Sequence, residues 1–269
     1  YFIYVWTATI LVIGCGENRN SNSKPKKAWN AENSPSLMED RFVEENNYVS
    51  KMSDLPLSGK LNKRPWSGDY WPTYKGGISY RWFDEDSDVE NRYSYELVKF
   101  DDLKDIDLRL LSPAEKLDIY MGLEFYPFTR LERMRTKVLK TVSSNINFEK
   151  NYEIPSWEGL CHAWAPATIA FDEPQPVVLK SKTGIEVPFG SSDIKALLTY
   201  FLHETKAHTY FLGTRCDVDI MDLTSKYKNG EISYSYYQDQ LEACSNVNAG
   251  AFHIVLANQI GRLKEGFIV

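Results

Sequence analysis

The segment 155–170 constrains the fold of this chain strongly. It passes from a turn that ends near Gly159 into a run of small residues, 163–170, with helical character. Proline inside a helix removes a hydrogen-bond donor and clashes with the preceding turn, so Pro166 is expected only near the start of a helix. The sequence therefore predicts that Cys161 lies at the N-terminus of a helix.

A cysteine in this position is a candidate nucleophile. The partial positive charge at a helix N-terminus stabilises a thiolate, and backbone amides there can donate hydrogen bonds to a developing oxyanion. The alternative is a small, inert cysteine that packs against a helix end. On the first interpretation, Trp157, His162 and Trp164 are candidates for the oxyanion site and the substrate cleft around Cys161.

A cysteine nucleophile needs a base, and the chain has four histidines. His162 directly follows Cys161, and consecutive helix residues do not face each other. His203 and His208 belong to a predicted helix, 193–212, where surface or structural roles are favoured. That leaves His253 as the favoured base.

His253 lies in an apolar run, 251–256, that predicts a strand. A polar side chain in such a run needs a partner or a role, and a papain-like enzyme also takes its histidine from a strand that follows the nucleophile. A hydrogen-bonded core histidine is the alternative. Asn258 is a weak candidate for the residue that orients the imidazole, because an offset of five residues puts it on the opposite face of a regular strand.

The rest of the chain predicts one α+β domain over residues 37–269, with a papain-like arrangement of the nucleophile helix and the histidine strand. Ser112 begins a helix with a capping box, and the basic segment 130–140 predicts a second, amphipathic helix. Gly76 and Gly77 predict a tight turn, and the tryptophans around them are expected to fill a core. The net charge of −6 argues against general nucleic-acid binding.

The N-terminal residues predict export. Residues 1–15 are too short to span a membrane as a helix, but they suit the apolar part of a lipoprotein signal peptide that ends in Cys15, the residue expected to carry the lipid. An ordinary signal peptide with a chance cysteine is the alternative. Residues 16–36 predict a flexible tether.

The remaining cysteines complete this interpretation. Export favours disulfides, and Cys216 with Cys244 would close a loop of roughly 28 residues, worth about 3–4 kcal/mol in the chain-entropy model. Cys161 is then unpaired. We expect no cofactor and no metal. The acidic cluster 84–90 has no His or Cys nearby, which argues against a metal site there, and the sequence contains no EF-hand-like run for calcium.

Several separated motifs resemble the transglutaminase elicitor family of oomycetes and its bacterial relatives. The segment 157–167 resembles the nucleophile motif of that family, and 248–258 resembles its histidine segment. The stretch 70–82 and the segments 193–198 and 213–216 match its character.

This resemblance implies a protein-glutamine γ-glutamyltransferase in which Cys161 attacks glutamine and His253 shuttles the proton. The implied partners are proteins that offer glutamine and lysine side chains. Calcium is not implied. The family's acidic residue after the histidine segment would lie beyond Val269, so we expect the catalytic domain to be truncated at its C-terminus.

Two alternatives remain open. A papain-like cysteine protease or amidase has the same nucleophile, base and oxyanion site, but it transfers the acyl group to water. A non-catalytic surface protein would instead bind through its Trp- and Tyr-rich face. On either interpretation we expect an exported protein, either anchored at a membrane through Cys15 or secreted.

Overall fold

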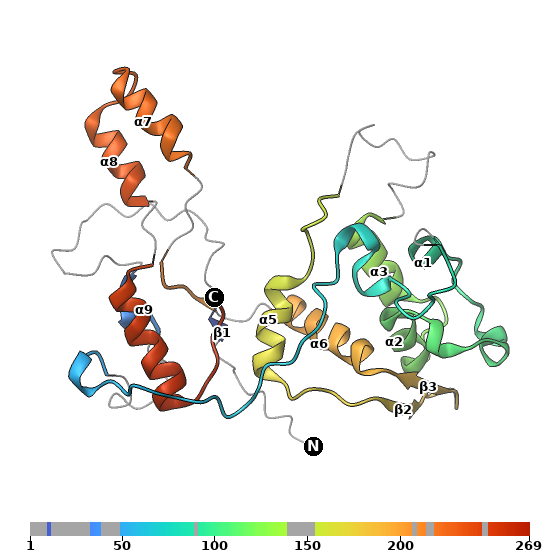
Figure 1. Cartoon of the computed structure of the whole chain (residues 1–269). Coiled ribbons are helices and arrows are strands. Elements are labelled where there is room, and N and C mark those ends of the chain that lie inside the picture. Colours follow the sequence, from blue (N-terminus) through green and yellow to red (C-terminus); the bar gives the residue numbers. More distant parts are fainter. Residues whose placement is uncertain are drawn as a thin grey trace. The chain divides into compact units, whose positions relative to one another are not determined.

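A computed structural model of the chain describes residues 10–11, 33–38, 49–88, 91–138, 154–205, 209–213, 218–243 and 247–269 (Figure 1). The chain divides into two compact units. One combines residues 1–64 with residues 207–269, and the other comprises residues 65–206. The single domain over 37–269 stays a prediction.

The unit of residues 65–206 is built mainly from helices, with one small antiparallel sheet. In this sheet, Val178 on one strand lies opposite Pro188 on the other. The regular elements are α1 (Asn91–Ser94), α2 (Pro113–Met121), α3 (Pro127–Thr136), α5 (Cys161–Ala170), β2 (Val177–Lys180), β3 (Glu186–Phe189) and α6 (Ser191–Thr205). The mixture of helix and strand agrees with an α+β chain in which helices dominate.

The start of α2 confirms the predicted capping box. The Ser112 hydroxyl accepts a hydrogen bond from the Glu115 amide at 3.2 Å, and the Glu115 carboxylate accepts one from the Ser112 amide at 2.9 Å. Pro113 occupies the first helical position, where its missing amide hydrogen costs nothing. The helix ends at Gly122, whose φ of 73° favours glycine.

The predicted turn at Gly76 and Gly77 is also present, with φ angles of 93° and 58°. The carboxylate of Glu132 on α3 accepts a hydrogen bond from the amide of Ile78, directly after this turn, at 3.1 Å. The turn therefore attaches residues 65–82, which we call the aromatic stretch, to α3.

Two hydrophobic clusters form the core of this unit. One lies between the aromatic stretch, α5 and α6, and its buried members are Trp66, Trp71, Ile78, Ala114, Leu160, Ala167, Ala196 and Tyr200. The other lies between α2 and the sheet, and its buried members are Leu103, Leu108, Leu111, Ile119, Tyr126, Val187 and Phe189.

The structure corrects the prediction for α6. The helix ends at Thr205 rather than at residue 212. The helical spacing of apolar residues in 193–212 predicts that Phe201 faces inward, but 54% of it is exposed. The buried face instead contains Asp193, whose carboxylate accepts a hydrogen bond from the Lys116 ammonium at 2.7 Å in an ion pair with both side chains almost fully buried. Helical spacing defines a buried stripe, but a polar residue with a partner can occupy it as well as an apolar one.

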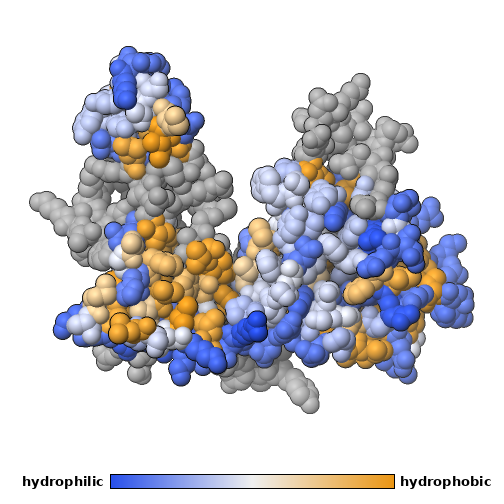
Figure 2. Space-filling model, in the orientation of Figure 1, coloured by the Kyte–Doolittle hydropathy of each residue, from blue (hydrophilic) through white to orange (hydrophobic). Residues whose placement is uncertain are grey.

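The other unit contains α7 (Ile220–Lys228), α8 (Tyr234–Ala243) and α9 (Ala249–Leu256), which continues into a π-helical segment, Ala257–Leu263. β1 (Ile10–Leu11) and β4 (Thr209–Tyr210) pair in parallel. The buried cluster beside α9 comprises Met38, Leu212, Ala251 and Val255. Figure 2 shows hydrophobic residues gathered over α9. Among the described helices, none is both long enough and apolar enough to cross a membrane.

Candidate active site

Cys161 is the first residue of α5, as predicted, and its thiol is free and exposed. Leu160 occupies the N-cap position, and its carbonyl accepts hydrogen bonds from the amides of Ala163 at 2.9 Å and Trp164 at 2.8 Å. Helix geometry leaves the amides of Cys161 and His162 without an acceptor inside the helix. The site therefore combines an accessible thiol with backbone donors and the positive end of a helix.

The position of Pro166 differs from the prediction. It is the sixth residue of α5, inside the helix rather than near its start. The carbonyl that loses its donor is that of His162, four residues earlier. His162 lies in the exposed first turn, where water can supply the missing hydrogen bond.

The loop before Cys161 is attached to the aromatic stretch by backbone hydrogen bonds. The Leu160 amide donates to the Tyr70 carbonyl at 2.6 Å, and the Thr73 amide donates to the Glu158 carbonyl at 2.9 Å. A methyl group on Gly159 would lie 2.5 Å from the Tyr70 carbonyl oxygen, so only glycine allows this close approach. Residues about 90 positions earlier in the sequence thus set the path of the chain into α5.

The tryptophans of the aromatic stretch stabilise this attachment from within the hydrophobic core. Trp66 and Trp71 are buried, and the Trp66 indole donates a hydrogen bond to the Phe171 carbonyl, just after α5, at 3.1 Å. Trp71 has a φ of 44°, which is rare for a bulky residue. The tryptophans therefore build the core under α5, which agrees with the predicted structural role.

The two tryptophans assigned to the predicted cleft differ in exposure. Trp157 is 76% exposed on the loop before Cys161, where a substrate can reach its indole. Trp164 packs against the core of the unit, and its Nε1 is buried with no hydrogen-bond partner in the described part of the chain. Their roles in a substrate cleft stay predictions.

A histidine pair that the sequence analysis did not predict lies beside Cys161. Nε2 of His162 on α5 is 2.9 Å from Nδ1 of His203 on α6. We call His162 and His203 the α5–α6 histidine pair. Their signal in the sequence is weak, because they are 41 residues apart and meet only when the two helices pack.

Burial lowers the pKa of both rings of this pair below the ordinary value of 6.5. For His162, the neighbouring His203 and the charge of Arg135 lower the pKa further. Arg135 also lowers the pKa of His203, against smaller opposing effects of Glu204 and Glu132. The neutral form of the pair is therefore favoured.

His253 lies on α9, so the predicted strand over 251–256 is wrong. Asn248 caps the helix, and its side chain accepts hydrogen bonds from the amides of Gly250 and Ala251. The ring of His253 is exposed. Cys161 and His253 belong to different compact units, and their pairing stays a prediction.

Asn258 has a structural environment of its own. Its Oδ1 accepts a hydrogen bond from the Val49 amide at 2.8 Å, and its Nδ2 donates to the carbonyls of Val49 at 2.7 Å and Ile254 at 2.8 Å. The side chain is fully buried. The described residues include no hydrogen bond between Asn258 and His253, so the orienting role of Asn258 stays a prediction.

Cys15, Cys216 and Cys244 lie outside the described residues, and with them the predicted lipid anchor and disulfide. In the described part of the chain, no group of three or more His, Cys, Asp or Glu side chains could hold a metal ion.

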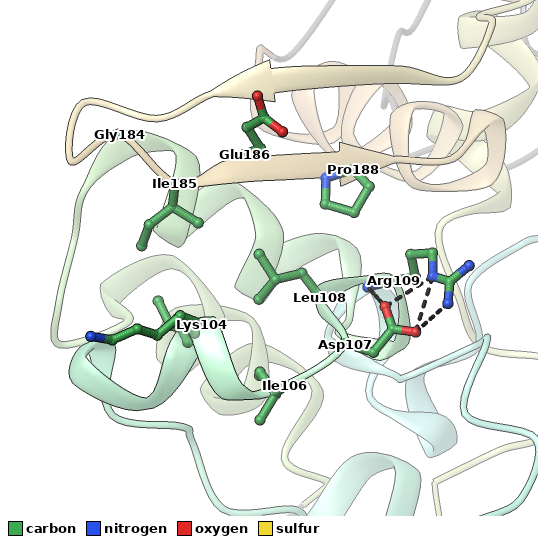
Figure 3. Close-up of a pocket in the computed structure, with 10 residues that line it drawn as sticks. Lys104, Ile106, Asp107, Leu108, Arg109, Gly184, Ile185, Glu186 and Pro188 are labelled. Atoms are coloured by element: carbon green, nitrogen blue, oxygen red, sulfur yellow. Dashed lines mark hydrogen bonds and ion pairs between the residues drawn. The ribbon is translucent and has the colours of Figure 1, made fainter.

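An open hollow of about 560 Å³ lies elsewhere in the same unit, between the segment 103–109 and β3 (Figure 3). Arg109 is held at its edge by the carboxylate of Asp107, with the closest contact at 2.6 Å. The hydrogen bonds from Arg109 lower the pKa of Asp107 to about 2. No lining residue belongs to α5, so this hollow is separate from the surroundings of Cys161.

Comparison with solved structures finds a likeness to the GP42 transglutaminase from Phytophthora sojae, with a TM-score of 0.48 and 21% sequence identity. The match covers 81% of this chain and 52% of that protein, so the chain spans about half the length of the solved structure. No curated protein matches the chain.

The family model for the transglutaminase elicitor matches residues 38–269, which is most of the chain and includes Cys161 and His253. This match agrees with the resemblance of the separate sequence motifs. The chain belongs to the transglutaminase elicitor family.

Proposed function

We propose that this protein is a protein-glutamine γ-glutamyltransferase that acts through a thioester on Cys161. The observation that carries the proposal is the free, exposed thiol of Cys161 as the first residue of α5, in a chain that belongs to the transglutaminase elicitor family. The amides of the first turn provide donors for an oxyanion.

In the first half-reaction, the Cys161 thiolate attacks the carbonyl carbon of a glutamine side chain. The tetrahedral oxyanion collapses, the C–N bond breaks, and ammonia leaves with a proton delivered by the base. In the second half-reaction, a lysine amine attacks the thioester and gives its proton to the base. The C–S bond then breaks, which regenerates the thiolate and leaves an isopeptide bond.

We assign the base to His253, which lies within the residues that the family model matches and whose ring is exposed on α9. The substrates are proteins that present glutamine and lysine side chains. The exposed indole of Trp157 offers them an aromatic surface on the loop before the thiol. We further propose that the protein is exported, with a lipid on Cys15 or in a secreted form.

The test is the incorporation of a fluorescent primary amine into a glutamine-rich protein, with Cys161→Ala as the control. Incorporation that depends on Cys161 supports the transferase. Release of ammonia without incorporation refutes it in favour of a hydrolase, and no turnover by the folded protein would point to a binding role.

A further inference from the structure

The α5–α6 histidine pair joins the first turn of α5 to the last part of α6. The facing nitrogens are 2.9 Å apart, and the ring centroids are 5.1 Å apart at an interplanar angle of 66°. His162 directly follows Cys161 in the chain, so this contact ties the backbone beside the thiol to α6.

The contact fixes how many hydrogens can lie between the two rings. A neutral imidazole has one nitrogen that donates and one that accepts, so the bond between Nε2 of His162 and Nδ1 of His203 needs one ring in each role. Only one of the two facing nitrogens can carry a hydrogen while this bond is present.

Charged and titratable groups surround the pair from three elements. Arg135 on α3 is held by Glu132 through two hydrogen bonds, at 2.6 and 2.7 Å, so its positive charge is fixed near both rings. Tyr200 on α6 packs against the edge of His203, with ring centroids 5.9 Å apart. Glu204 on α6 acts on His203, and Glu158 on the loop before α5 acts on Arg135.

We propose that the α5–α6 histidine pair is a positioning device that holds the first turn of α5, and with it the Cys161 thiol, in its reactive position while the pair carries at most one proton beyond those of the two neutral rings. A single added proton leaves a hydrogen bond, because an imidazolium can still donate to a neutral imidazole. Two protons place hydrogens on both facing nitrogens, and two like charges then meet beside Arg135. The contact between the two rings opens when both are protonated. Acidification therefore frees the first turn of α5 from α6.

The effect of the pair on catalysis rests on the proposed function, but the position of the thiol can be tested without any catalytic turnover. The measurement is the rate at which a methanethiosulfonate reagent modifies Cys161 in the full chain, followed by the mass of the Cys161 peptide. Each rate is divided by that of a free model thiol at the same pH, which removes much of the ordinary dependence on thiolate fraction. The same variants are assayed for kcat and KM in amine incorporation.

Three substitutions of His203 separate the hydrogen bond from the ring. Asparagine places an amide near the position of Nδ1 and can donate to His162 without carrying a charge, glutamine reaches instead toward the position of Nε2, and alanine removes the contact. Thr205→Ala, at an exposed position of the same helix, is the control. Circular dichroism verifies that each variant is folded.

We expect His203→Ala and His203→Gln to lower the modification rate at neutral pH by about threefold to tenfold, the range of one hydrogen bond, with His203→Asn and Thr205→Ala near wild type. We also expect an added loss on acidification in the wild type that His203→Asn lacks. Equal rates for the asparagine, glutamine and alanine variants would overturn the proposal. If the rates follow this order while the wild type incorporates no amine, the positioning role stands and the proposed function fails.

Discussion

Substitution of Gly159 by alanine tests whether the attachment of the loop before Cys161 to the aromatic stretch determines the position of the thiol. The added methyl group would lie 2.5 Å from the Tyr70 carbonyl oxygen, 2.7 Å from Cδ2 of the same residue and 3.2 Å from the Trp71 carbonyl oxygen. The shortest of these distances is about 1 Å below the normal contact distance. Either the neighbouring backbone moves or the loop lifts.

Both responses, overpacking around the methyl group and lifting of the loop, lower the free energy of unfolding by a similar amount. Retaining the loop in place requires overpacking, which typically costs about 1–3 kcal/mol. Lifting the loop instead breaks the hydrogen bonds from Leu160 to Tyr70 and from Thr73 to Glu158, at about 0.5–1.5 kcal/mol each. We therefore expect Gly159→Ala to lower the free energy of unfolding by about 1–3 kcal/mol. A displacement of the thiol near 1 Å would reduce turnover by about 100-fold.

Urea unfolding followed by tryptophan fluorescence measures the stability, and modification of Cys161 measures the local change. Gly190→Ala is the matched control, because its methyl group would meet no atom closer than 3.5 Å and its φ is not in the left-handed region. We expect the control to remain within about 0.5 kcal/mol of wild type. If Gly159→Ala matched the control in both stability and thiol reactivity, the close packing of this loop would not position the thiol, and the reasoning would be refuted.

Three further predictions concern the buried residues Asp193 and Asn258 and the partly exposed histidine pair. Asp193→Ala leaves the buried ammonium of Lys116 without its carboxylate partner, so we expect the free energy of unfolding in urea to fall by about 3–5 kcal/mol. A decrease below about 1 kcal/mol would contradict a buried ion pair. Asn258→Ala removes hydrogen bonds to the backbone of Val49, so we expect a stability loss of about 1–3 kcal/mol; a loss of turnover at full stability would instead indicate a catalytic role. The α5–α6 histidine pair has lowered folded-state pKa values, so its stabilisation is complete above pH 6.5 and is lost as the pH falls toward those values. Urea midpoints from pH 7.5 to 5 should therefore fall more steeply for the wild type than for His203→Asn, and parallel curves would contradict this.

Local signals in the sequence predict the structure well, as α2 shows. Ser112, Pro113 and Glu115 specify a helix start through contacts within four residues, and the structure contains each of them. The turn at Gly76 and Gly77 is equally local, because it depends only on the freedom of glycine to adopt positive φ.

The segment around His253 shows where a local interpretation fails. A six-residue apolar run is compatible with a strand and with a buried helix, so its composition does not separate the two. The buried positions from 251 to 259 are Ala251, Ile254, Val255, Ala257, Asn258 and Gln259. Among them, Ala251, Ile254, Val255 and Asn258 have the spacing of a helix, which leaves His253 exposed. The pattern becomes clear only when Asn258 is counted as buried, and its burial depends on Val49, 209 residues away.

The elements that place the Cys161 thiol all belong to the unit of residues 65–206. Tyr70 and Thr73 fix the loop before α5, and His203 contacts the first turn from α6. The proposed base, His253, comes from the other unit. Placement of the thiol and its activation by a base are therefore separable properties of this chain. The sequence predicts the position of Cys161 because a helix start is local, whereas the contacts that hold this start are non-local and emerge only from the fold.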